Sequence, residues 1–376
     1  MKRRIRIEER RIVHVIGSLT AGGAERFVAD LLPEIKRRGN EVALIALSGR
    51  RDALGDRMHD ALRSEGIRVL NGPTRRIRFR SVVWYGHTLR RLRPDLIHLH
   101  LLNTEAAHYL VHRFLRHPYV GVRTIHSTQP HVSALAGRGL ERNPISATIF
   151  CSEASRSRTE RLMEGFKATI PNGIRFDWPI RTRQSSLEYK RRLGLEPERT
   201  HFLCVGSFLG TSLETSPKAH DTIVHAWKRG EAGRRGAILH LLGDGNLRPQ
   251  MESLVGADPT IRLHGVRPDV CDWMIAADCF LMPSRWEGLP IAALEAIGTG
   301  IPCIFSSIPP LEDLQPPCAI WCAASDVDSL AGAIRNFIEN PTFPDEPAIE
   351  AERKRHAVAN TAEAYLAIYD RFSDED

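Results

Sequence analysis

The stretch PSRWEGLPIAALEA, residues 283–296, is the most informative part of the sequence about the fold. It begins where the apolar run Cys279 to Pro283 ends, and that run has the length and composition of a buried strand. Its second half is expected to form a helix that starts at Pro290, because proline is favoured at the first helical position. Open α/β sheets bind ligands at the carboxyl ends of their strands. The stretch therefore predicts a ligand site at the edge of a parallel sheet.

The turn before this helix is suited to phosphate. The amides of Gly288 and Leu289 precede Pro290 and are expected to be available for phosphate oxygens. Glu287 lies in the loop, and Glu295 lies about five helical steps after Pro290, about 7.5 Å at about 1.5 Å per residue. Two carboxylates at that separation can each accept hydroxyl groups, as a ribose on one side and a hexose on the other require.

The same alternation of strand and helix extends along the whole chain. Apolar strand-like runs in the first half cover residues 12–17, 42–47, 96–101, 121–125 and 147–151. In the second half they cover residues 201–206, 238–243, 261–265, 279–283, 301–305 and 319–322. Amphipathic stretches such as residues 24–38 separate them, which is the βαβ pattern of a parallel sheet covered by helices. The sequence predicts an α/β fold with two doubly wound, Rossmann-like domains in tandem.

A chain of 376 residues suits two domains, since one domain commonly holds about 100 to 200 residues. The boundary is expected within residues 170–183, where prolines, an asparagine and a glycine favour turns. We expect an N-terminal domain over residues 1–175 and a C-terminal domain over residues 176–349. A last segment, residues 350–376, is expected to hold a helix over 350–372 and then an acidic tail.

Composition restricts the class of protein. A hydrophobic content of 42% and a charged content of 26% are those of a globular protein. The apolar runs are much shorter than the roughly 20 residues that cross a bilayer, and residues 1–11 are basic without the apolar core of a secretory signal. We therefore expect a cytoplasmic protein. Its seven cysteines contain no CxxC pair, so reduced, mostly buried thiols are expected.

Charge divides unevenly between the two halves. Residues 1–180 carry 32 Lys and Arg against 17 Asp and Glu, a balance of +15, whereas the whole chain has a net charge of +7. Arginines concentrate around an aromatic and aliphatic segment, at positions 75, 76, 78, 80, 90, 91 and 93. This pattern fits peripheral contact with the anionic inner face of a membrane, and it fits equally a solvated helix packed by its apolar side. No nucleic-acid partner is expected, because no helix-turn-helix, RNP-like or zinc pattern is present.

With its two spaced glutamates, the chain resembles the retaining glycosyltransferase family four, the group 1 glycosyltransferases of GT-B fold. The hallmark of that family is two glutamates separated by seven residues, as Glu287 and Glu295 are. Other matching motifs follow in the expected order, namely GGAER at 22–26, PNGI at 171–174, Lys218, GDG at 243–245 and IPC at 301–303. The resemblance covers nearly the whole chain. It implies two facing Rossmann-like domains, the first on the acceptor side and the second binding the nucleotide sugar, with a C-terminal helix that returns to the first domain.

The resemblance also implies roles for residues of the second domain. Glu295 would hold the ribose of the donor, and Glu287 would contact the transferred sugar. The turn of Gly288, Leu289 and Pro290 would bind phosphate. Lys218, ahead of a helix, would neutralise the departing pyrophosphate. If these roles do not apply, the two glutamates are a loop carboxylate and a solvated helix residue, and Lys218 is a surface lysine.

In the first domain, the resemblance implies that Gly22 and Gly23 allow the backbone to approach the donor, since residues without side chains permit this. His126 matches the histidine that faces the donor sugar, although a histidine at a strand end is often only a hydrogen-bonded core residue. The implied mechanism is front-face attack, in which the acceptor hydroxyl passes its proton to the leaving phosphate. No protein nucleophile, cofactor or metal is expected.

The chain departs from the family at Ser207, where an arginine usually partners the lysine on the diphosphate. Residues 208–217 then intervene before Lys218. Compensation of the phosphate charge is expected to be weaker or to come from another cation, with Arg285 and Arg267 as candidates.

Two histidine pairs have spacings that occur in metal sites. His98 and His100 alternate on a strand, and His108 and His112 are one helical turn apart. No further ligand set accompanies them, so we expect no metal there, and an alternative for His100, at the carboxyl end of a strand, is to line the cleft.

The sequence predicts retaining transfer of a hexosyl unit from a nucleotide sugar to a glycan or lipid-linked glycan, in bacterial exopolysaccharide or envelope glycan biosynthesis. The alternatives are a nucleotide-sugar epimerase of GT-B fold, which needs no acceptor, and a degenerate homologue that only binds nucleotide, for which Ser207 is the support. The base and sugar of the donor are left open, as are the acceptor and the linkage.

Overall fold

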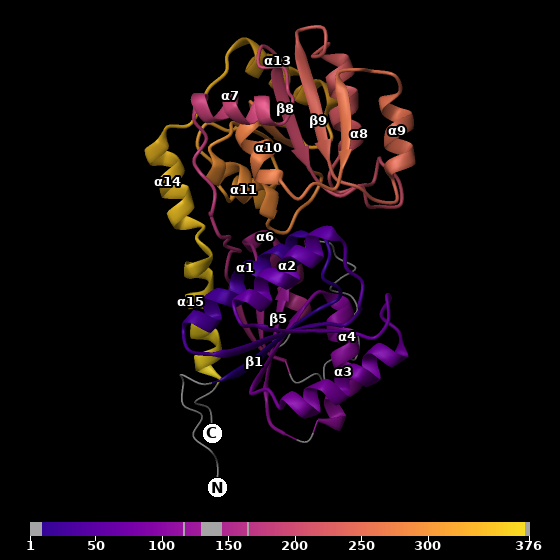
Figure 1. Cartoon of the computed structure of the whole chain (residues 1–376), viewed down its shortest axis with the longest axis vertical. Helices are drawn as coiled ribbons and strands as arrows, with labels where there is room; N and C mark the ends of the chain where they lie inside the picture. The colour runs from indigo at the N-terminus through magenta and orange to yellow at the C-terminus, as the bar shows by residue number, and fades with distance from the viewer. Residues whose placement is uncertain (1–9, 116, 129–144, 164, 373–376) are drawn as a thin grey trace. The chain divides into compact units, whose positions relative to one another are not determined.

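The computed structural model of the protein describes residues 10–115, 117–128, 145–163 and 165–372. The chain divides into two compact units (Figure 1). Unit 1 comprises residues 1–175 together with 356–376, and unit 2 comprises residues 176–355. The acidic tail expected at residues 373–376 and most of the basic N-terminal segment lie outside the described residues.

Unit 1 contains a parallel sheet with the order β3-β2-β1-β4-β5-β6-β7 in its described part. The strands are β1 (Arg11–Ile16), β2 (Glu41–Ala46), β3 (Arg68–Asn71), β4 (Leu96–His100), β5 (Val120–Ile125), β6 (Ile145–Phe150) and β7 (Phe166–Thr169). The helical segments are α1 (Gly23–Arg37), α2 (Ala53–Ser64), α3 (Phe79–Leu92), α4 (Leu102–Val111), η2 (His112–Phe114), α6 (Glu153–Thr159), η3 (Glu160–Leu162) and α15 (Val358–Arg371).

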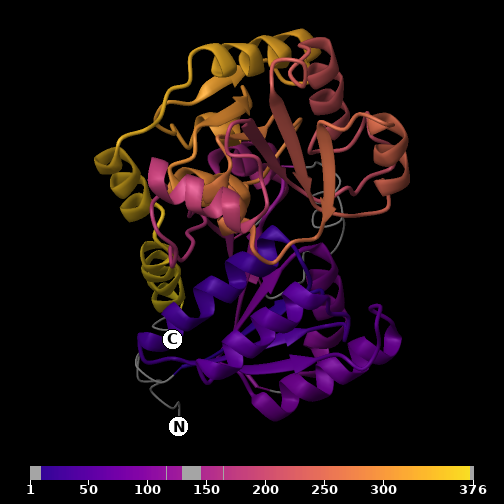
Figure 2. The ribbon, with the colours of Figure 1, turned by 45° about the horizontal axis from the view of Figure 1, so that its top comes forward.

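The centre of this sheet is buried on both faces. Every residue of β4 is buried, and β1 is buried after its first residue. Helices α1 and α15 pack together, as the indigo and yellow ribbons show in Figures 1 and 2. The edge strands β3 and β7, which were not expected from the sequence, are short and only partly buried. Short edge strands carry little of the continuous apolar pattern by which a central parallel strand is recognised.

Unit 2 contains a second parallel sheet, with the order β10-β9-β8-β11-β12-β13 in the described residues. Its strands are β8 (Thr200–Val205), β9 (Ala237–Leu242), β10 (Ile261–Gly265), β11 (Cys279–Met282), β12 (Cys303–Ser306) and β13 (Ile320–Cys322). Its helices are α7 (Arg183–Arg192), α8 (His220–Arg229), α9 (Arg248–Val255), α10 (Val270–Ala276), α11 (Ile291–Thr299), α12 (Pro309–Glu312), α13 (Val327–Glu339) and α14 (Glu346–Arg355). The prediction of two doubly wound parallel sheets is confirmed.

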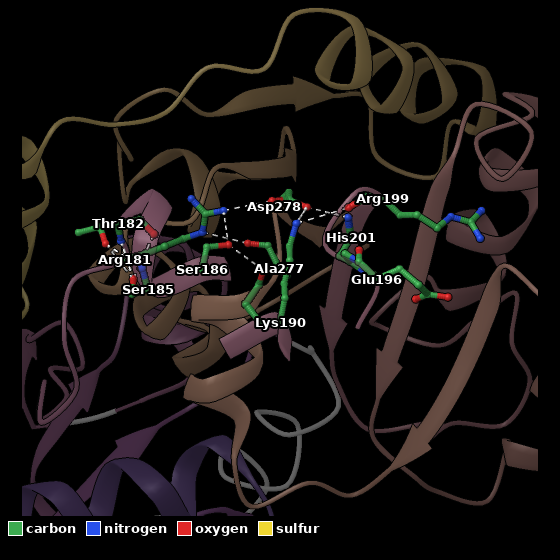
Figure 3. A network of polar contacts seen from close by, with 11 residues as sticks. Arg181, Thr182, Ser185, Ser186, Lys190, Glu196, Arg199, His201, Ala277 and Asp278 are labelled. Carbon is green, nitrogen blue, oxygen red and sulfur yellow. Dashed lines mark hydrogen bonds and ion pairs between the residues drawn. The ribbon is translucent and has the colours of Figure 1, made fainter. Parts of the chain in front are cut away.

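The strand order of unit 2 reverses between β8 and β11. This reversal is the topological switch point of a doubly wound sheet, beside which ligands bind at the carboxyl ends of the strands. The opposite, amino-terminal ends of the same strands are fastened by Asp278, which accepts from Arg181 at 3.2 Å, from Lys190 at 2.7 Å and from the amide of His201 at 2.9 Å (Figure 3). The two cations are buried, so their pairing with one carboxylate holds α7 against the sheet.

The C-terminal segment differs from the single helix expected over residues 350–372. Two helices occur there, and α14 belongs to unit 2 whereas α15 belongs to unit 1. Between them, the carbonyl of His356 accepts from the amide of Ile174 at 3.0 Å, and the carbonyl of Ile174 accepts from the amide of Val358 at 3.0 Å. The helix is interrupted because these backbone groups pair with Ile174 rather than along the helix.

No helix of the described residues combines the length and the apolar character that crossing a bilayer requires.

Candidate functional site

The loop between β11 and α11 lies at the switch point of unit 2. It starts at Pro283 and reaches helix α11 through Pro290. Pro290 is the N-cap, one position before the first helical residue, and its carbonyl accepts from the amides of Ala293 at 3.1 Å and Leu294 at 3.4 Å. The expectation that Pro290 is the first helical residue is therefore wrong by one position. The N-cap Pro290 makes no side-chain cap, and the N-terminal end of a helix carries a partial positive charge that favours anions.

Glu287 and Lys218 form an ion pair in this loop region. Lys218 Nζ lies 2.7 Å from Glu287 Oε1, and Ser284 Oγ donates to the same oxygen at 2.6 Å. The Glu287 side chain is 9% exposed and that of Lys218 is 21% exposed, so water screens the pair only in part. Two positions expected in the donor site, 69 residues apart in sequence, thus contact each other.

Lys218 is brought to the site by the turn before α8. Ala219 follows it with a φ of 52°, a left-handed conformation that is uncommon for a residue with a side chain. The lysine packs beside the end of β8, because a Cβ added to Gly206 would lie 3.1 Å from its Cγ. Gly206 therefore leaves the space that the lysine stem occupies. Ser207, which follows Gly206, is exposed.

Glycines of the segment 243–245 permit a close approach of backbone in the same region. A Cβ on Gly243 would lie 1.9 Å from the carbonyl oxygen of Gly206, and a Cβ on Gly245 would lie 2.2 Å from that of Phe208. Gly243 also has a φ of 147°. The GDG motif therefore has a physical reason, since any side chain at its two glycines would separate the loops after β8 and β9.

Glu295 lies on α11, four residues into the helix after Ile291, and is half-buried. It belongs to the same unit as Glu287, with one carboxylate in the loop and the other on the helix, as the spacing predicted. Gly288 and Leu289 are buried in the turn between them.

The two arginines considered as replacements for the missing cation are engaged elsewhere. Arg285 forms a bidentate pair with Asp221 at 3.0 and 2.7 Å and donates to the carbonyl of Ser216 at 2.9 Å. It therefore ties the loop before Lys218 to helix α8. Arg267 pairs with Asp269 at 2.9 and 2.6 Å. Neither arginine is left as an isolated cation in this structure.

His220 is a candidate that sequence reasoning missed. It is the first residue of α8, 1% exposed, and neither ring nitrogen has a hydrogen-bond partner within the described part of the chain. A Cβ on Gly206 would lie 3.5 Å from its Nε2, which places the ring beside Lys218 at the end of β8. Burial, together with the charges of Lys218 and Arg285, lowers the pKa of His220 to about 3. The sequence offers one signal for His220, its position at the start of a predicted helix and two residues after Lys218.

In unit 1, the expected glycines lie at the start of α1. Gly22 is the N-cap and Gly23 the first helical residue, and both are exposed. The carboxylate of Glu25 occupies the space beside Gly22, where an added Cβ would lie 2.2 Å from its Oε2. Burial raises the pKa of Glu25 to about 7, while hydrogen bonding to its own backbone opposes this shift and Asp52 adds to it.

His126 follows β5 and is half-buried, with its Nε2 3.0 Å from His100 Nδ1. His98 and His100 are completely buried in β4. His14 on β1 joins them, and one nitrogen of each of these three rings lies within 4.8 Å of the others. His14 was not predicted from the sequence, because it lies more than eighty residues away from His98 and His100.

His108 and His112, the second pair with a metal-like spacing, have different surroundings. His108 Nδ1 contacts the hydroxyl of Tyr85 at 2.9 Å and its Nε2 contacts that of Tyr119 at 3.0 Å. Both nitrogens of His108 are therefore used in hydrogen bonds to tyrosines, and the described residues include no metal-ligand group around this pair.

Two family profiles match the chain. One, described as Glycosyltransferase Family 4, matches residues 21–178, and the other, described as Glycosyl transferases group 1, matches residues 199–340. The two matches lie mainly in unit 1 and within unit 2, respectively.

Individual relatives agree with this match. The chain is 26% identical over 236 residues to the lipopolysaccharide core biosynthesis mannosyltransferase LpsB of Rhizobium meliloti, over 58% of this chain and 64% of LpsB, less than two thirds of its length. It is 26% identical over 367 residues to the lipopolysaccharide core biosynthesis glycosyltransferase LpsD of the same organism, over 94% of this chain and 96% of LpsD.

Among solved structures, HepE of Anabaena in complex with UDP and glucose superposes with a TM-score of 0.78 over 97% of this chain and 100% of that chain, at 16% identity. At that identity the likeness concerns the fold. With the two parallel sheets and the two profile matches, it shows that the chain is a member of the glycosyltransferase group 1, family 4, with the GT-B fold.

Proposed function

We propose that this glycosyltransferase transfers a hexosyl unit, with retention of configuration, from a nucleotide sugar to a glycan or lipid-linked glycan acceptor in bacterial exopolysaccharide or envelope glycan biosynthesis. The observation that carries the proposal is the contact of Lys218 with Glu287 at the switch point of unit 2, beside the N-terminal end of α11. A cation, a carboxylate and the N-terminal end of a helix suit a sugar linked to a diphosphate.

The proposed division of roles in unit 2 follows the chemistry of the donor. Cleavage of a glycosyl phosphate develops negative charge on the leaving diphosphate, which Lys218 and the turn of Gly288, Leu289 and Pro290 would stabilise. Glu295 would accept the hydroxyls of the ribose, and Glu287 would contact the transferred sugar.

His220 supplies a further donor for the diphosphate in this proposal. A neutral imidazole carries one N–H, and His220 has no competing partner among the described residues. Because it lies beside Gly206 and Lys218, it would take over part of the role of the arginine that family members have at the position of Ser207.

In unit 1, Gly22 and Gly23 are proposed to let backbone amides approach the donor, and His126 is proposed to contact the transferred sugar. The acceptor hydroxyl would attack on the face from which the diphosphate departs and pass its proton to a leaving phosphate oxygen. Neither a protein nucleophile nor a metal takes part in this scheme. The family generally works without metal on a nucleotide-sugar substrate.

We also propose that unit 1 contacts an anionic membrane surface at the cytoplasmic face, where a lipid-linked acceptor would be presented. Helix α3 packs on α4 through its buried side, whereas Phe79 is 80% exposed. Leu110 at the end of α4 and Phe114 in η2 are 59% and 66% exposed. All seven arginines that flank this region, at positions 75, 76, 78, 80, 90, 91 and 93, are exposed. Exposed aromatic groups among cations suit an anionic bilayer interface.

The test is calorimetric titration of the full chain with UDP, GDP and ADP in the presence of EDTA, for the wild type, Glu295→Ala and the control Glu252→Ala. Glu252 is an exposed glutamate of α9 in the same unit. We expect one nucleotide to bind the wild type and the control, and the Glu295→Ala variant to bind at least about tenfold more weakly, since a lost hydrogen bond to a charged group costs about 1.5 to 3 kcal/mol. Equal affinity in all three proteins would remove the assignment of Glu295.

Product analysis with radiolabelled donor then decides among the alternatives. Transfer to an added glycan or lipid-linked acceptor supports the proposal. Conversion of the donor sugar without acceptor would identify an epimerase. Tight nucleotide binding with no turnover of any nucleotide sugar would identify a degenerate homologue.

A further inference from the structure

Four histidines form a continuous row across the middle of the sheet in unit 1. His14 lies on β1, His98 and His100 lie on β4, and His126 follows β5. The first three are completely buried. Ring centroids of His14 lie 4.9 Å from His98 and 5.2 Å from His100, and those of His100 and His126 lie 5.3 Å apart.

Hydrogen bonds join this row to the C-terminal helix α15. From His126 Nε2, the chain runs through His100 Nδ1 at 3.0 Å, and from His100 Nε2 to His14 Nδ1 at 2.9 Å. His14 Nε2 lies 3.4 Å from the hydroxyl of Tyr369 on α15, and that hydroxyl lies 2.6 Å from His98 Nδ1.

Beyond Tyr369 the chain continues to a second tyrosine of α15. His98 Nε2 lies 2.7 Å from Thr124 Oγ1, which lies 2.9 Å from the hydroxyl of Tyr365. Four imidazoles and three hydroxyls are thus linked by six contacts from the proposed sugar-contacting residue to the C-terminal helix. We define this set as the histidine chain: His126, His100, His14, Tyr369, His98, Thr124 and Tyr365.

All four imidazoles are neutral at physiological pH. Burial lowers the pKa of His14 to about 3 and that of His126 to about 4. Burial also lowers the pKa of His98 and of His100 well below the ordinary value, and neighbouring histidines lower both further. A neutral imidazole has one N–H and one bare nitrogen, so a ring that accepts on one side must donate on the other.

This rule couples the rings. Each member of the histidine chain contributes one proton, and each contact needs one. Every contact receives a proton, with one donor facing one acceptor, only if all members donate in the same direction along the chain. Two such arrangements exist. In one, His126 carries its proton on Nε2, and in the other it carries its proton on Nδ1.

The distances at Tyr369 favour the first arrangement. A phenol is a stronger donor than a neutral imidazole, so it donates in the short contact of 2.6 Å to His98 and accepts in the long contact of 3.4 Å from His14. His14 then carries its proton on Nε2, and the same follows for His100 and His126. Nδ1 of His126, which takes no part in the histidine chain, is left as a hydrogen-bond acceptor.

Unit 2 contains a comparable row in which the direction is fixed by a backbone group. His201 Nε2 lies 2.8 Å from the carbonyl oxygen of Glu196, which can only accept. His201 Nδ1 therefore accepts from His240 at 2.9 Å, and His240 Nδ1 accepts from His264 at 2.9 Å. All three rings must carry their proton on Nε2, so this row is an internal reference for the tautomer.

A metal centre at His14, His98 and His100 is the competing explanation of the cluster. One nitrogen of each lies within 4.8 Å of the others. However, all six ring nitrogens already lie within 2.6 to 3.4 Å of hydrogen-bonding partners. An ion would have to break several of these buried bonds, which favours the hydrogen-bonded chain.

We infer that Tyr369, His14 and His100 are positioning residues that hold His126 in the tautomer with its proton on Nε2, so that Nδ1 accepts a hydrogen bond. Such an acceptor receives a hydrogen bond from a sugar hydroxyl, whereas a phosphate without a proton offers it none. The contact of His126 with sugar rests on the proposed function, and the tautomer does not.

The test is long-range proton–nitrogen correlation NMR of the full chain labelled with ¹⁵N at histidine, at pH 7.5. The protonated and the bare nitrogen of an imidazole resonate at well-separated frequencies, so the tautomer is read directly. We expect proton on Nε2 in His14, His100 and His126 of the wild type, with the same pattern as in His201, His240 and His264. A proton on Nδ1 of His126, or an even mixture, overturns the inference.

Two matched variants test the coupling. Tyr365→Phe and Tyr369→Phe each remove one hydroxyl from a completely buried tyrosine of α15. Only Tyr369 lies between His98 and His14, so we expect Tyr369→Phe to give a mixture of tautomers at His126 and Tyr365→Phe to leave the wild-type pattern. An unchanged pattern in Tyr369→Phe overturns the coupling. If Tyr369→Phe does not fold, the wild type alone tests the coupling. It is then overturned if His14, His100 and His126 do not all carry their proton on the same ring nitrogen.

The NMR measurement needs neither the nucleotide-sugar donor nor the glycan acceptor. The tautomer can therefore be wrong while nucleotide binding is found, and nucleotide binding can be absent while the tautomer is found. In a transfer assay we further expect Tyr369→Phe to lower kcat about tenfold, the lower end of the loss seen when an outer partner of a metal-bound histidine is removed, with little change for Tyr365→Phe. An equal loss in both variants would indicate a merely structural role.

Discussion

Lys218 Nζ lies 2.7 Å from Glu287 Oε1, so the cation proposed for the diphosphate is held by the carboxylate proposed for the sugar. This contact makes the position of each side chain depend on the other. It also means that substituting one of them affects the charge balance of the loop as well as contacts with the donor.

Substituting Lys218 by methionine is expected to lower kcat/KM by about 10²-fold or more, the loss usual when one group that stabilises developing negative charge is removed. The control is Lys228→Met in the last turn of α8, the helix that follows Lys218, where the lysine donates to the carbonyl of Leu254. Steady-state kinetics with the donor identified by titration gives the comparison. Equal kcat/KM in the two variants would contradict a role of Lys218 in transfer.

Arg285 is expected to act in stability rather than in binding of phosphate. Its bidentate partner is Asp221, and both side chains are 12% exposed. Leaving one partner of a buried pair alone costs about 3 to 5 kcal/mol. We therefore expect Arg285→Met to lower the free energy of unfolding by about 3 kcal/mol.

Urea denaturation measures this loss, with Arg267→Met as the control. The pair of Arg267 with Asp269 is 38% and 24% exposed, and exposed pairs contribute about 0 to 1 kcal/mol. If Arg285→Met were as stable as this control but lost nucleotide affinity, the arginine would have the role first considered for it.

Much of this fold was predictable because central parallel strands are apolar along their whole length. The edge strands β3 and β7 lack that pattern and were missed. The end of α14 was missed for a different reason, since it depends on backbone bonds to Ile174, about 180 residues away in sequence. No local pattern reports such a partner.

Local spacing was enough to place Glu287 in the loop and Glu295 on the helix, whereas their roles toward the donor stay a prediction. The state of a side chain was not predictable where it depends on neighbours that are distant in sequence. Arg285 is adjacent to the motif, yet its contacts with Asp221 remove it from consideration as an isolated cation. His220 appeared to be an ordinary helix residue until its burial and its unpartnered ring nitrogens in the described structure were known.

The basic surface of unit 1 is expected to bind vesicles that contain anionic lipid. Each basic residue near such a surface contributes about 1 kcal/mol, so the double variant Arg90→Gln with Arg91→Gln should bind about thirtyfold more weakly. Phe79→Ser should weaken binding as well, because it removes a ring that is 80% exposed. Sedimentation with phosphatidylserine-containing and neutral vesicles measures both effects.

The matched control is the double variant Arg191→Gln with Arg192→Gln, two exposed arginines of α7 in unit 2. It should bind like the wild type. Binding that is absent at low salt, or that falls equally in both double variants, would leave the arginines around α3 as an ordinary solvated surface.

Acid is expected to destabilise the protein below pH 6.5 because buried histidines must remain neutral in the folded state. Burial lowers the pKa of His220 from 6.5 to about 3. The folded-state pKa is depressed, so the stabilisation is fully present above pH 6.5 and is lost as the pH falls towards 3. Between these values the unfolded chain binds a proton that the folded chain does not, which lowers the free energy of unfolding by up to about 1.4 kcal/mol per pH unit for each such group.

His220→Leu isolates one of these groups, because the ring makes no hydrogen bond within the described residues that the substitution would break. We expect urea denaturation between pH 5 and 6.5 to show a pH slope smaller by about 1 kcal/mol per pH unit in this variant than in the wild type. His87→Gln, which changes an exposed histidine of α3, should keep the wild-type slope. If His220→Leu keeps the wild-type slope as well, the pKa of His220 is not lowered in the folded state, and its assignment as a buried, neutral imidazole beside Lys218 is wrong.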